Sequence, residues 1–282
     1  MPSSYLTRLS VLRAHDVTPA MRRLVLGGPE LSQLVERWSG DTDAYVKIAF
    51  LAPGVDYPEQ IDLAEIRESH PAEHWPVLRT YTIRRLDPEA GELWIDFVVH
   101  GDEGLAGPWA TRAQVGEVVH LRGPGGAYRP DPEADHQLLV GDEAAIPAIL
   151  AAIESLRPGQ RATAFVEVDG PEHEQPVVTD GDVEVHWLHR APAHAGTTTL
   201  LDEAVRAWPW PGGRVQIFVH GESGLLKSVR PYLVKERGVE RRDVSVSAYW
   251  RLGETEEGFR EWKAAERARG EEPMMTPEAP RA

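Results

Sequence analysis

Short stretches of alternating hydrophobic and polar residues run through residues 1–130 of the chain. The clearest are rich in β-branched residues or alternate with period two, and they cover Met21–Leu26, Ala44–Phe50, Leu78–Arg84, Leu93–His100 and Glu117–Leu121. Pro, Gly and Asp separate these stretches. Short strands divided by turn residues predict a small antiparallel barrel, here a six-stranded one. Pro108 favours the first turn of a helix, so a short helix is expected after Gly107.

The pattern changes after residues 123–135, a stretch rich in Gly, Pro and Asp. Strands are then predicted over His136–Val140, Arg161–Val168, Val183–His189, Val215–His220 and Val244–Tyr249, and helices over Ala144–Leu156, Thr197–Trp208, Ser223–Arg237 and Glu256–Arg269. This alternation is typical of a parallel α/β sheet. The sequence therefore predicts a barrel domain at 1–130, an α/β domain at 131–270 and a disordered tail at 271–282.

The composition narrows the possible functions. The chain contains no cysteine, which excludes disulfides, iron–sulfur clusters and thiolate chemistry. Its formal net charge is -15, so neither a nucleic acid nor an anionic membrane surface is an expected partner. The sequence has no long apolar run and no apolar region of a signal peptide near its start. We therefore expect a cytoplasmic protein, with a monomer as the simplest state.

The segment Arg79–Arg84 carries the strongest chemical signal. It reads Arg-Thr-Tyr-Thr-Ile-Arg on a predicted strand, and alternation places Arg79, Tyr81 and Ile83 on one face. A flavin needs a cation for its pyrophosphate, an aromatic face against the ring or ribityl chain, and a hydroxyl near the ring edge. The segment supplies all three. The same pattern also occurs in ordinary amphipathic strands.

Two further segments have the character of ligand-binding turns. Residues Gly104–Gly107 follow a strand and open the predicted short helix, where small residues and free N–H groups favour a phosphate. Gly141, Asp142 and Glu143 form the first strand-to-helix turn of the α/β domain, where open sheets bind ligands. An acidic pair repels a pyrophosphate, so we expect contacts to the nicotinamide or the flavin edge there, or a helix cap by Asp142.

Taken together, these segments resemble the siderophore-interacting proteins in order and spacing. The resemblance covers residues 5–265 and is most specific at Arg79–Thr82 and Tyr249–Arg251. It implies an FAD-binding barrel, a nicotinamide-binding α/β domain and reduction of iron in ferric siderophores. It assigns cofactor contacts to Arg79, Thr80, Tyr81, Thr82, Val99, His100, Ala106, Gly107, Trp109, Asp142, Glu143 and Trp250.

The resemblance also guides the expected substrate contacts. An anionic ferric siderophore needs cations, and Lys47, Arg129 and Arg251 are the candidates. Electron transfer requires no protein acid or base, so no catalytic residue is assigned, and no histidine spacing predicts a metal site. NADH and NADPH both stay open as donors. Glu167 and Asp169, after the second strand, favour NADH, whereas Arg190 offers a cation to a 2′-phosphate.

Two alternatives remain at this stage. A general NAD(P)H-dependent flavin reductase, or an electron-transfer partner of an oxygenase, would use the same two domains. A non-catalytic siderophore-binding module would keep the fold with a vestigial flavin site, although Arg79, Tyr81 and Thr82 argue against that.

Overall fold

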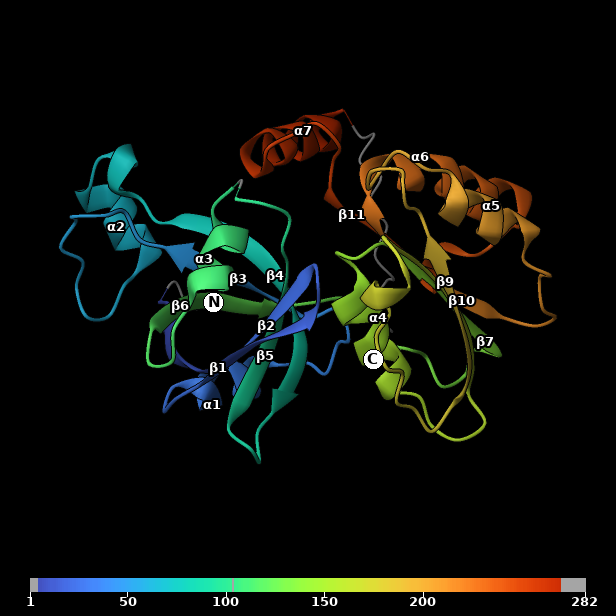
Figure 1. Ribbon diagram of the computed structural model, residues 1–282, viewed down its shortest axis with the longest axis horizontal. Helices are drawn as coiled ribbons and strands as arrows, with labels where there is room; N and C mark the ends of the chain where they lie inside the picture. The colour runs from blue at the N-terminus through green and yellow to red at the C-terminus, as the bar shows by residue number, and fades with distance from the viewer. Residues whose placement is uncertain (1–4, 103, 270–282) are drawn as a thin grey trace. The chain divides into compact units, whose positions relative to one another are not determined.

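The computed structural model of the protein describes residues 5–102 and 104–269 (Figure 1). The chain divides into two compact units. The first contains residues up to Gly40 together with Ala44–Gly126, and the second contains Asp41–Asp43 and the residues from Ala127 onward. Among the described helices none is both long enough and apolar enough to cross a membrane. The predicted tail at 271–282 lies outside the described residues.

The first unit is a closed antiparallel barrel, as the alternating pattern predicts. Its strands pair in the order β1-β2-β5-β4-β3-β6. They are β1 (Thr7–Thr18), β2 (Met21–Gly27), β3 (Tyr45–Phe50), β4 (Val77–Asp87), β5 (Glu92–Val98) and β6 (Val118–Gly125). β1 is not among the clearest predicted stretches, although it pairs with both β2 and β6 and so closes the barrel.

Short helices decorate the barrel. These are α1 (Leu31–Arg37), α2 (Leu63–Ser69), the 3₁₀ turn η1 (Ala72–His74) and α3 (Ala106–Arg112). The sequence pattern indicates only the last of them. α3 begins one residue before Gly107, not after it, so Gly107 and Pro108 both lie in its first turn. Proline is tolerated there because the first N–H groups of a helix have no partner within it.

Aromatic rings from β3, β4, β5 and α3 pack together against the barrel core. Phe97 lies 4.3 Å from Tyr81 and 5.7 Å from Trp109, and Trp109 lies 5.3 Å from Phe50, measured between ring centroids. Phe97 is fully buried, and the other three rings pack against the barrel core. The flavin-type segment of β4 is therefore built on a rigid aromatic floor.

The second unit is a five-stranded parallel sheet with the order β11-β10-β7-β8-β9. The strands are β7 (His136–Gly141), β8 (Arg161–Val168), β9 (Asp182–His189), β10 (Val215–Glu222) and β11 (Val244–Trp250). This confirms the predicted α/β sheet. In chain order the strands run 3-2-1-4-5, so the direction of winding reverses between β7 and β10. Ligands of open α/β sheets bind at the carboxyl ends of the strands at such a point.

Helices α4 (Ile146–Glu154), α5 (Leu200–Ala207), α6 (Ser223–Pro231) and α7 (Glu256–Ala268) accompany the sheet, with short turns η2 (Pro171–His173), η3 (Tyr232–Glu236) and η4 (Arg241–Asp243). One buried cluster joins α5, α6 and α7 to side chains of β7, β10 and β11. The single helix expected over Ser223–Arg237 is wrong in one respect. Regular α-helix ends at Pro231, and a π-turn continues it to Glu236. A proline ring disrupts the hydrogen bond of the preceding turn.

Two arginine–carboxylate pairs on the barrel provide a test of its energetics. Arg23 holds Asp96 by two hydrogen bonds of 2.6 and 2.7 Å, and the Asp96 side chain is fully buried. Arg13 holds Glu92 in the same two-bonded way at 2.7 and 2.8 Å, but the Arg13 side chain is 53% exposed. The two-bonded geometry is matched, and the main difference between the pairs is burial.

We expect Arg23→Gln to lower the free energy of unfolding of the barrel by about 3–5 kcal/mol, because it leaves a buried carboxylate without its cation. Arg13→Gln should have a far smaller effect, because water solvates the exposed pair. Urea unfolding followed by tryptophan fluorescence measures both. Equal losses in the two variants would show that burial does not decide the strength of these pairs.

Candidate functional site

The register of β4 places the flavin-type residues in the barrel. Arg79 lies opposite Ile48 of β3, and Tyr81 lies opposite Val46. Directly opposed residues of antiparallel strands share a face, so Arg79 and Tyr81 are on the face of the barrel core. The alternation expected from the sequence holds as far as Ile83, where the pairing with β5 shifts register.

Two polar side chains of this segment are buried, although Arg and Thr are mostly exposed in proteins. Arg79 is 9% exposed and Thr82 is 8% exposed, whereas Thr80 is exposed. Arg79 donates from Nη1 to the carbonyl of Leu78 at 3.3 Å. Tyr81 is half-buried, and its ring packs against the ring of Phe97. A fixed guanidinium, a hydroxyl and an aromatic ring on one strand form a donor set that fits the pyrophosphate and ring of FAD.

The segment after β5 combines glycine turns with exposed backbone. Gly101 and Gly104 adopt positive φ angles of 62° and 80°, and a Cβ at either position would meet nothing within 4 Å. Val99 is half-buried and donates its N–H to the carbonyl of Ala20, while His100 is exposed. This leaves open space beside the backbone that leads into α3, as a bulky phosphate group requires.

Trp109 has a structural role that the sequence did not indicate. Its indole Nε1 donates to Glu117 Oε1 at 2.6 Å, and its ring packs between Phe50 and Phe97. Its polar atom is therefore engaged within the barrel. Ala106 is buried and Gly107 half-buried in the same helix, so any contact of α3 with a cofactor depends chiefly on the backbone of its first turn.

A basic pair lies on the outer face of the barrel. Lys47 is opposite Thr80 of β4 on one side and opposite Arg122 of β6 on the other. Lys47 and Arg122 are both half-buried, and Thr80 is exposed. Sequence reasoning selected Lys47 but missed Arg122, because only the cross-strand register brings it beside Lys47.

In the second unit, Asp142 joins the ends of three strands. It follows β7, and its Oδ2 accepts hydrogen bonds from the backbone N–H of Glu222 at the end of β10 and from Nε1 of Trp250 at the end of β11, at 2.9 and 2.8 Å. Its Oδ1 accepts from the N–H of Ala144 at 3.0 Å. The side chain does not cap α4, whose N-cap is Ala145. Burial raises the pKa of Asp142 to about 7 despite these donors.

Two glycines allow close packing here, Gly221 against the carboxylate of Asp142 and Gly141 between β7 and β10. A Cβ on Gly221, which has a φ of 141°, would lie 2.6 Å from Oδ2 of Asp142. A Cβ on Gly141 would lie 2.4 Å from the Cβ of Ala145 and 2.6 Å from the carbonyl oxygen of His220. Both distances are shorter than van der Waals contact, so any larger residue would push the strands apart.

The negative charge of Glu143, the second acid of the pair, is compensated by an arginine of the same unit. Arg190 Nη1 contacts Glu143 Oε1 at 2.5 Å, and Arg190 Nη2 lies 3.6 Å from Asp169. The side chains of Arg190 and Glu143 are each 10% exposed. Arg190, which the sequence offered as a cation for a 2′-phosphate, is thus held between two carboxylates.

A pocket of about 240 Å³ lies at the carboxyl edge of the sheet beside Asp142. Four acids line it, namely Asp142, Glu167, Asp202 and Glu222, together with residues 196–199 of the loop before α5. No arginine or lysine is among its described lining residues. Glu167 accepts a hydrogen bond from Thr198 at 2.5 Å, and burial raises its pKa. The pocket is polar, acidic and suited to hydroxyl-rich ligands.

The two other predicted substrate cations already have neighbours within the second unit. Arg129 lies 3.5 Å from Asp41, and Arg251 places its guanidinium 4.8 Å from the ring centroid of Trp262 in α7. The final helix therefore positions Arg251. Trp250 itself is half-buried and donates its indole N–H to Asp142, and a Cβ on Gly196 would lie 2.8 Å from its ring.

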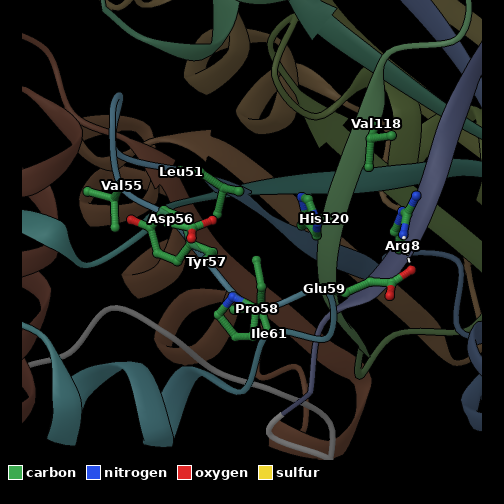
Figure 2. A pocket seen from close by; sticks show the side chains of 10 residues that line it. All are labelled: Arg8, Leu51, Val55, Asp56, Tyr57, Pro58, Glu59, Ile61, Val118 and His120. Carbon is green, nitrogen blue, oxygen red and sulfur yellow. Dashed lines mark hydrogen bonds and ion pairs between the residues drawn. The ribbon is translucent and has the colours of Figure 1, made fainter.

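A larger cavity of about 370 Å³ lies on the first unit, between β1, β6 and residues 51–61 (Figure 2). It contains none of the predicted site residues. Its arginine, Arg8, is paired with Glu59 at 3.3 Å, and burial followed by the charge of Arg8 lowers the pKa of His120. We find no donor set for a flavin or an iron chelate in it.

Sequence comparison identifies the relatives of the chain. The model of the siderophore-interacting FAD-binding domain matches residues 10–128, and the model of the siderophore-interacting protein matches residues 134–253. The ferric vibriobactin reductase of Vibrio cholerae is 33% identical over 260 residues, covering 90% of this chain and 92% of that protein. The chain belongs to the siderophore-interacting protein family.

Two other matches extend over nearly the whole chain of this siderophore-interacting protein. An uncharacterized protein of Mycobacterium tuberculosis is 43% identical over 265 residues, covering 90% of this chain and 93% of the other. The crystal structure of a siderophore utilization protein from T. fusca superimposes with a TM-score of 0.76 at 36% identity, covering 90% and 96% of the two chains. The family and the fold that the motifs predicted are both confirmed.

Replacement of Asp142 by Asn tests its raised pKa. An acid with a raised folded-state pKa stabilises the fold fully while it is protonated, and this contribution is lost as the pH rises through about 7. Asparagine stays neutral throughout. We therefore expect the Tm of the wild type to fall relative to that of Asp142→Asn from about pH 4, the ordinary pKa of an aspartate, to about pH 7, and to level off above that.

The exposed Asp180, which precedes β9, supplies the control for a change of net charge. The difference in Tm between wild type and Asp180→Asn should stay constant over the same range. If Asp142→Asn gives the same constant difference, then Asp142 is ionised at every pH tested and its proposed pKa is wrong.

Proposed function

We propose that this siderophore-interacting protein is a flavin-dependent reductase of ferric siderophores that draws its electrons from NADH. The observation that carries the proposal is the buried donor set of β4, within a domain that belongs to the FAD-binding family. Relatives named ferric vibriobactin reductase and ferric acinetobactin reductase support the same activity. Bound FAD would supply the conversion of a two-electron donor into single-electron transfers.

In this proposal the barrel residues hold the cofactor. Arg79 provides a fixed cation for the pyrophosphate, and its burial strengthens that interaction because water screens it little. Tyr81 presents its ring, backed by Phe97, and Thr82 presents a hydroxyl. Thr80, Val99, His100, Ala106, Gly107 and Trp109 complete the cofactor contacts that the family pattern implies.

The second unit contributes orientation of the donor and of Trp250. Asp142 fixes the indole of Trp250, so the aromatic ring at the end of β11 has one position. Glu143 lies at the same edge of the sheet, where it forms an ion pair with Arg190. We propose that the nicotinamide nucleotide binds along this edge, where the hydroxyls of Thr197, Thr198 and Thr199 and the pocket acids match ribose hydroxyls.

The charge of that pocket is the reason for choosing NADH over NADPH. Four acidic side chains line it with no lysine or arginine among its described lining residues. Of these acids Asp202 is paired with Arg206 at 2.8 Å, and Arg190 is engaged by Glu143 and Asp169. A 2′-phosphate would add two further negative charges to this environment. The anionic ferric siderophore is instead assigned to Lys47 with Arg122, and to Arg129 and Arg251.

An anaerobic spectrum of the purified protein tests the electron path. Flavin absorption that bleaches with NADH and returns on addition of a ferric catecholate or hydroxamate chelate is expected. A protein that bleaches but prefers free flavin over ferric chelates would be a general flavin reductase. A colourless protein that refuses added FAD would be a binding module only.

The role of Arg79 has a matched test on the same strand. We expect Arg79→Gln to weaken FAD binding by about ten- to a hundredfold, since a charge-assisted hydrogen bond to phosphate is lost. Arg85→Gln removes the same charge from an exposed side chain that pairs with Asp87, and should leave FAD affinity unchanged. Titration of the FAD-depleted proteins with FAD, followed by flavin fluorescence, measures both. Similar affinities in the two variants would exclude Arg79 as a phosphate ligand.

The choice of donor is tested by kinetics. We expect kcat/KM to be higher with NADH than with NADPH by about tenfold or more, as like charges disfavour the extra phosphate. Asp202→Asn, in the pocket, should raise kcat/KM for NADPH more than for NADH. Asp180→Asn, at the opposite edge of the sheet, should change neither. A preference for NADPH in the wild type would refute the donor assignment and leave the reductase proposal standing.

A further inference from the structure

A compact group of metal-type ligands lies just beyond β8. The strand ends at Val168, and the turn η2 folds the chain back so that His173 Nε2 lies 4.0 Å from Asp169 Oδ2 and 3.7 Å from Glu172 Oε1. One donor atom from each of the three residues lies within 4.8 Å of the others. The described residues contain no second group of this kind.

His173 distinguishes this group from an ordinary cluster of surface acids. The residue is 7% exposed, and its Nδ1 is buried with no hydrogen-bond partner. The nitrogen that matters for the cluster is Nε2: it faces both carboxylates at a distance too long for a hydrogen bond to either, so it is placed to bind a ligand that lies between the three side chains.

The three side chains differ in how far they can move. His173 is fixed by burial, whereas the side chains of Asp169 and Glu172 are 46% and 60% exposed. Metal–ligand bonds of about 2.0–2.2 Å bring donor atoms to roughly 3 Å from one another, so the carboxylates must move inward by about 1 Å. Exposed carboxylates can make that movement by rotating about their side-chain bonds.

We propose that Asp169, Glu172 and His173 bind a divalent first-row transition metal ion, with water in the remaining coordination positions. One imidazole and two carboxylates suit Fe(II), Mn(II), Co(II) and Zn(II), while Mg(II) and Ca(II) prefer oxygen ligands alone. Three ligands at the surface leave open positions, so the ion exchanges with solvent and has no structural role.

The reaction proposed for the protein identifies the ion in use as Fe(II). This step rests on the proposed function, because reduction of a ferric siderophore yields Fe(II) on this same protein. Asp169 also lies 3.6 Å from Arg190, which holds Glu143, the second acid of the pair at the sheet edge. The site thus lies within the nicotinamide-type domain and can receive iron that has left its chelator.

The experiment is a titration of the FAD-loaded, oxidised protein with Mn(II), with free Mn(II) measured by electron paramagnetic resonance. We expect one saturable site in the wild type. Glu172→Gln removes an exposed ligand without disturbing the core and should weaken that site by at least about tenfold. His173→Gln should do the same.

Glu184→Gln is the matched control. Glu184 lies 3.2 Å from His186 on β9, so the variant removes an equal charge from a histidine–carboxylate pair that lacks a third ligand. The saturable site should survive this change. Equal binding in Glu172→Gln and wild type, or only weak unsaturable binding in the wild type, would overturn the proposed site.

Competition under anaerobic conditions decides the identity of the ion. Fe(II) should displace Mn(II) from the wild type, as it binds such donor sets more tightly. Failure to displace would overturn the assignment to iron. Glu172→Gln should still reduce ferric chelates at the wild-type rate, because the residue contacts no proposed cofactor or substrate. A protein that binds the metal but reduces no chelate would refute the proposed function and leave the metal site standing.

Discussion

The carboxylate of Asp142 is the constraint on which the second unit depends. Three strands end around it: β10 and β11 donate hydrogen bonds to it from Glu222 and Trp250, and Gly221 leaves it the space that a Cβ would fill. The sheet reverses its winding at this point, so the strands diverge and leave a pocket there. One buried acid thus fixes the indole of Trp250 and sets the spacing of β7 and β10.

In the barrel the main constraint is different: a charged side chain, Arg79, is buried among apolar residues. Arg79 shares a face with Ile48 and Tyr81, and the aromatic contacts of Phe97 make these surroundings rigid. A cation held in this way loses little conformational entropy when it meets a phosphate. On the neighbouring strands β2 and β5, the half-buried Arg23 is paired with Asp96, so Arg23 and Arg79 have separate roles: the first stabilises the fold and the second is a candidate for the cofactor.

Much of this architecture could be predicted from the sequence, since period-two alternation in the first half and strand–helix alternation in the second specify barrel and sheet. β1 was not singled out because Arg13, His15 and Asp16 interrupt its apolar face at the surface end. Helices α1 and α2 are each seven residues long, too short for a periodic pattern. At the candidate site, motif spacing selected Arg79, Asp142 and Trp250, but not Arg122 or the pairing of Glu143 with Arg190. Those depend on contacts between residues far apart in the chain.

An acidic protein can bind an anionic substrate only where its basic residues are gathered apart from its acidic ones. The local contacts show one basic and one acidic neighbourhood. At the sheet edge, the pocket beside Asp142 is lined by four acids, and Arg190 is shared by Glu143 and Asp169. On the barrel, Lys47 and Arg122 are neighbours across two strands. Under the proposed function a ferric chelate is assigned to the Lys47–Arg122 surface, and a divalent cation to the carboxylates of the second unit. Reduction changes the iron from an ion that its anionic chelator holds tightly to one that carboxylate and imidazole ligands can accept, so the two kinds of surface match the two states of the metal.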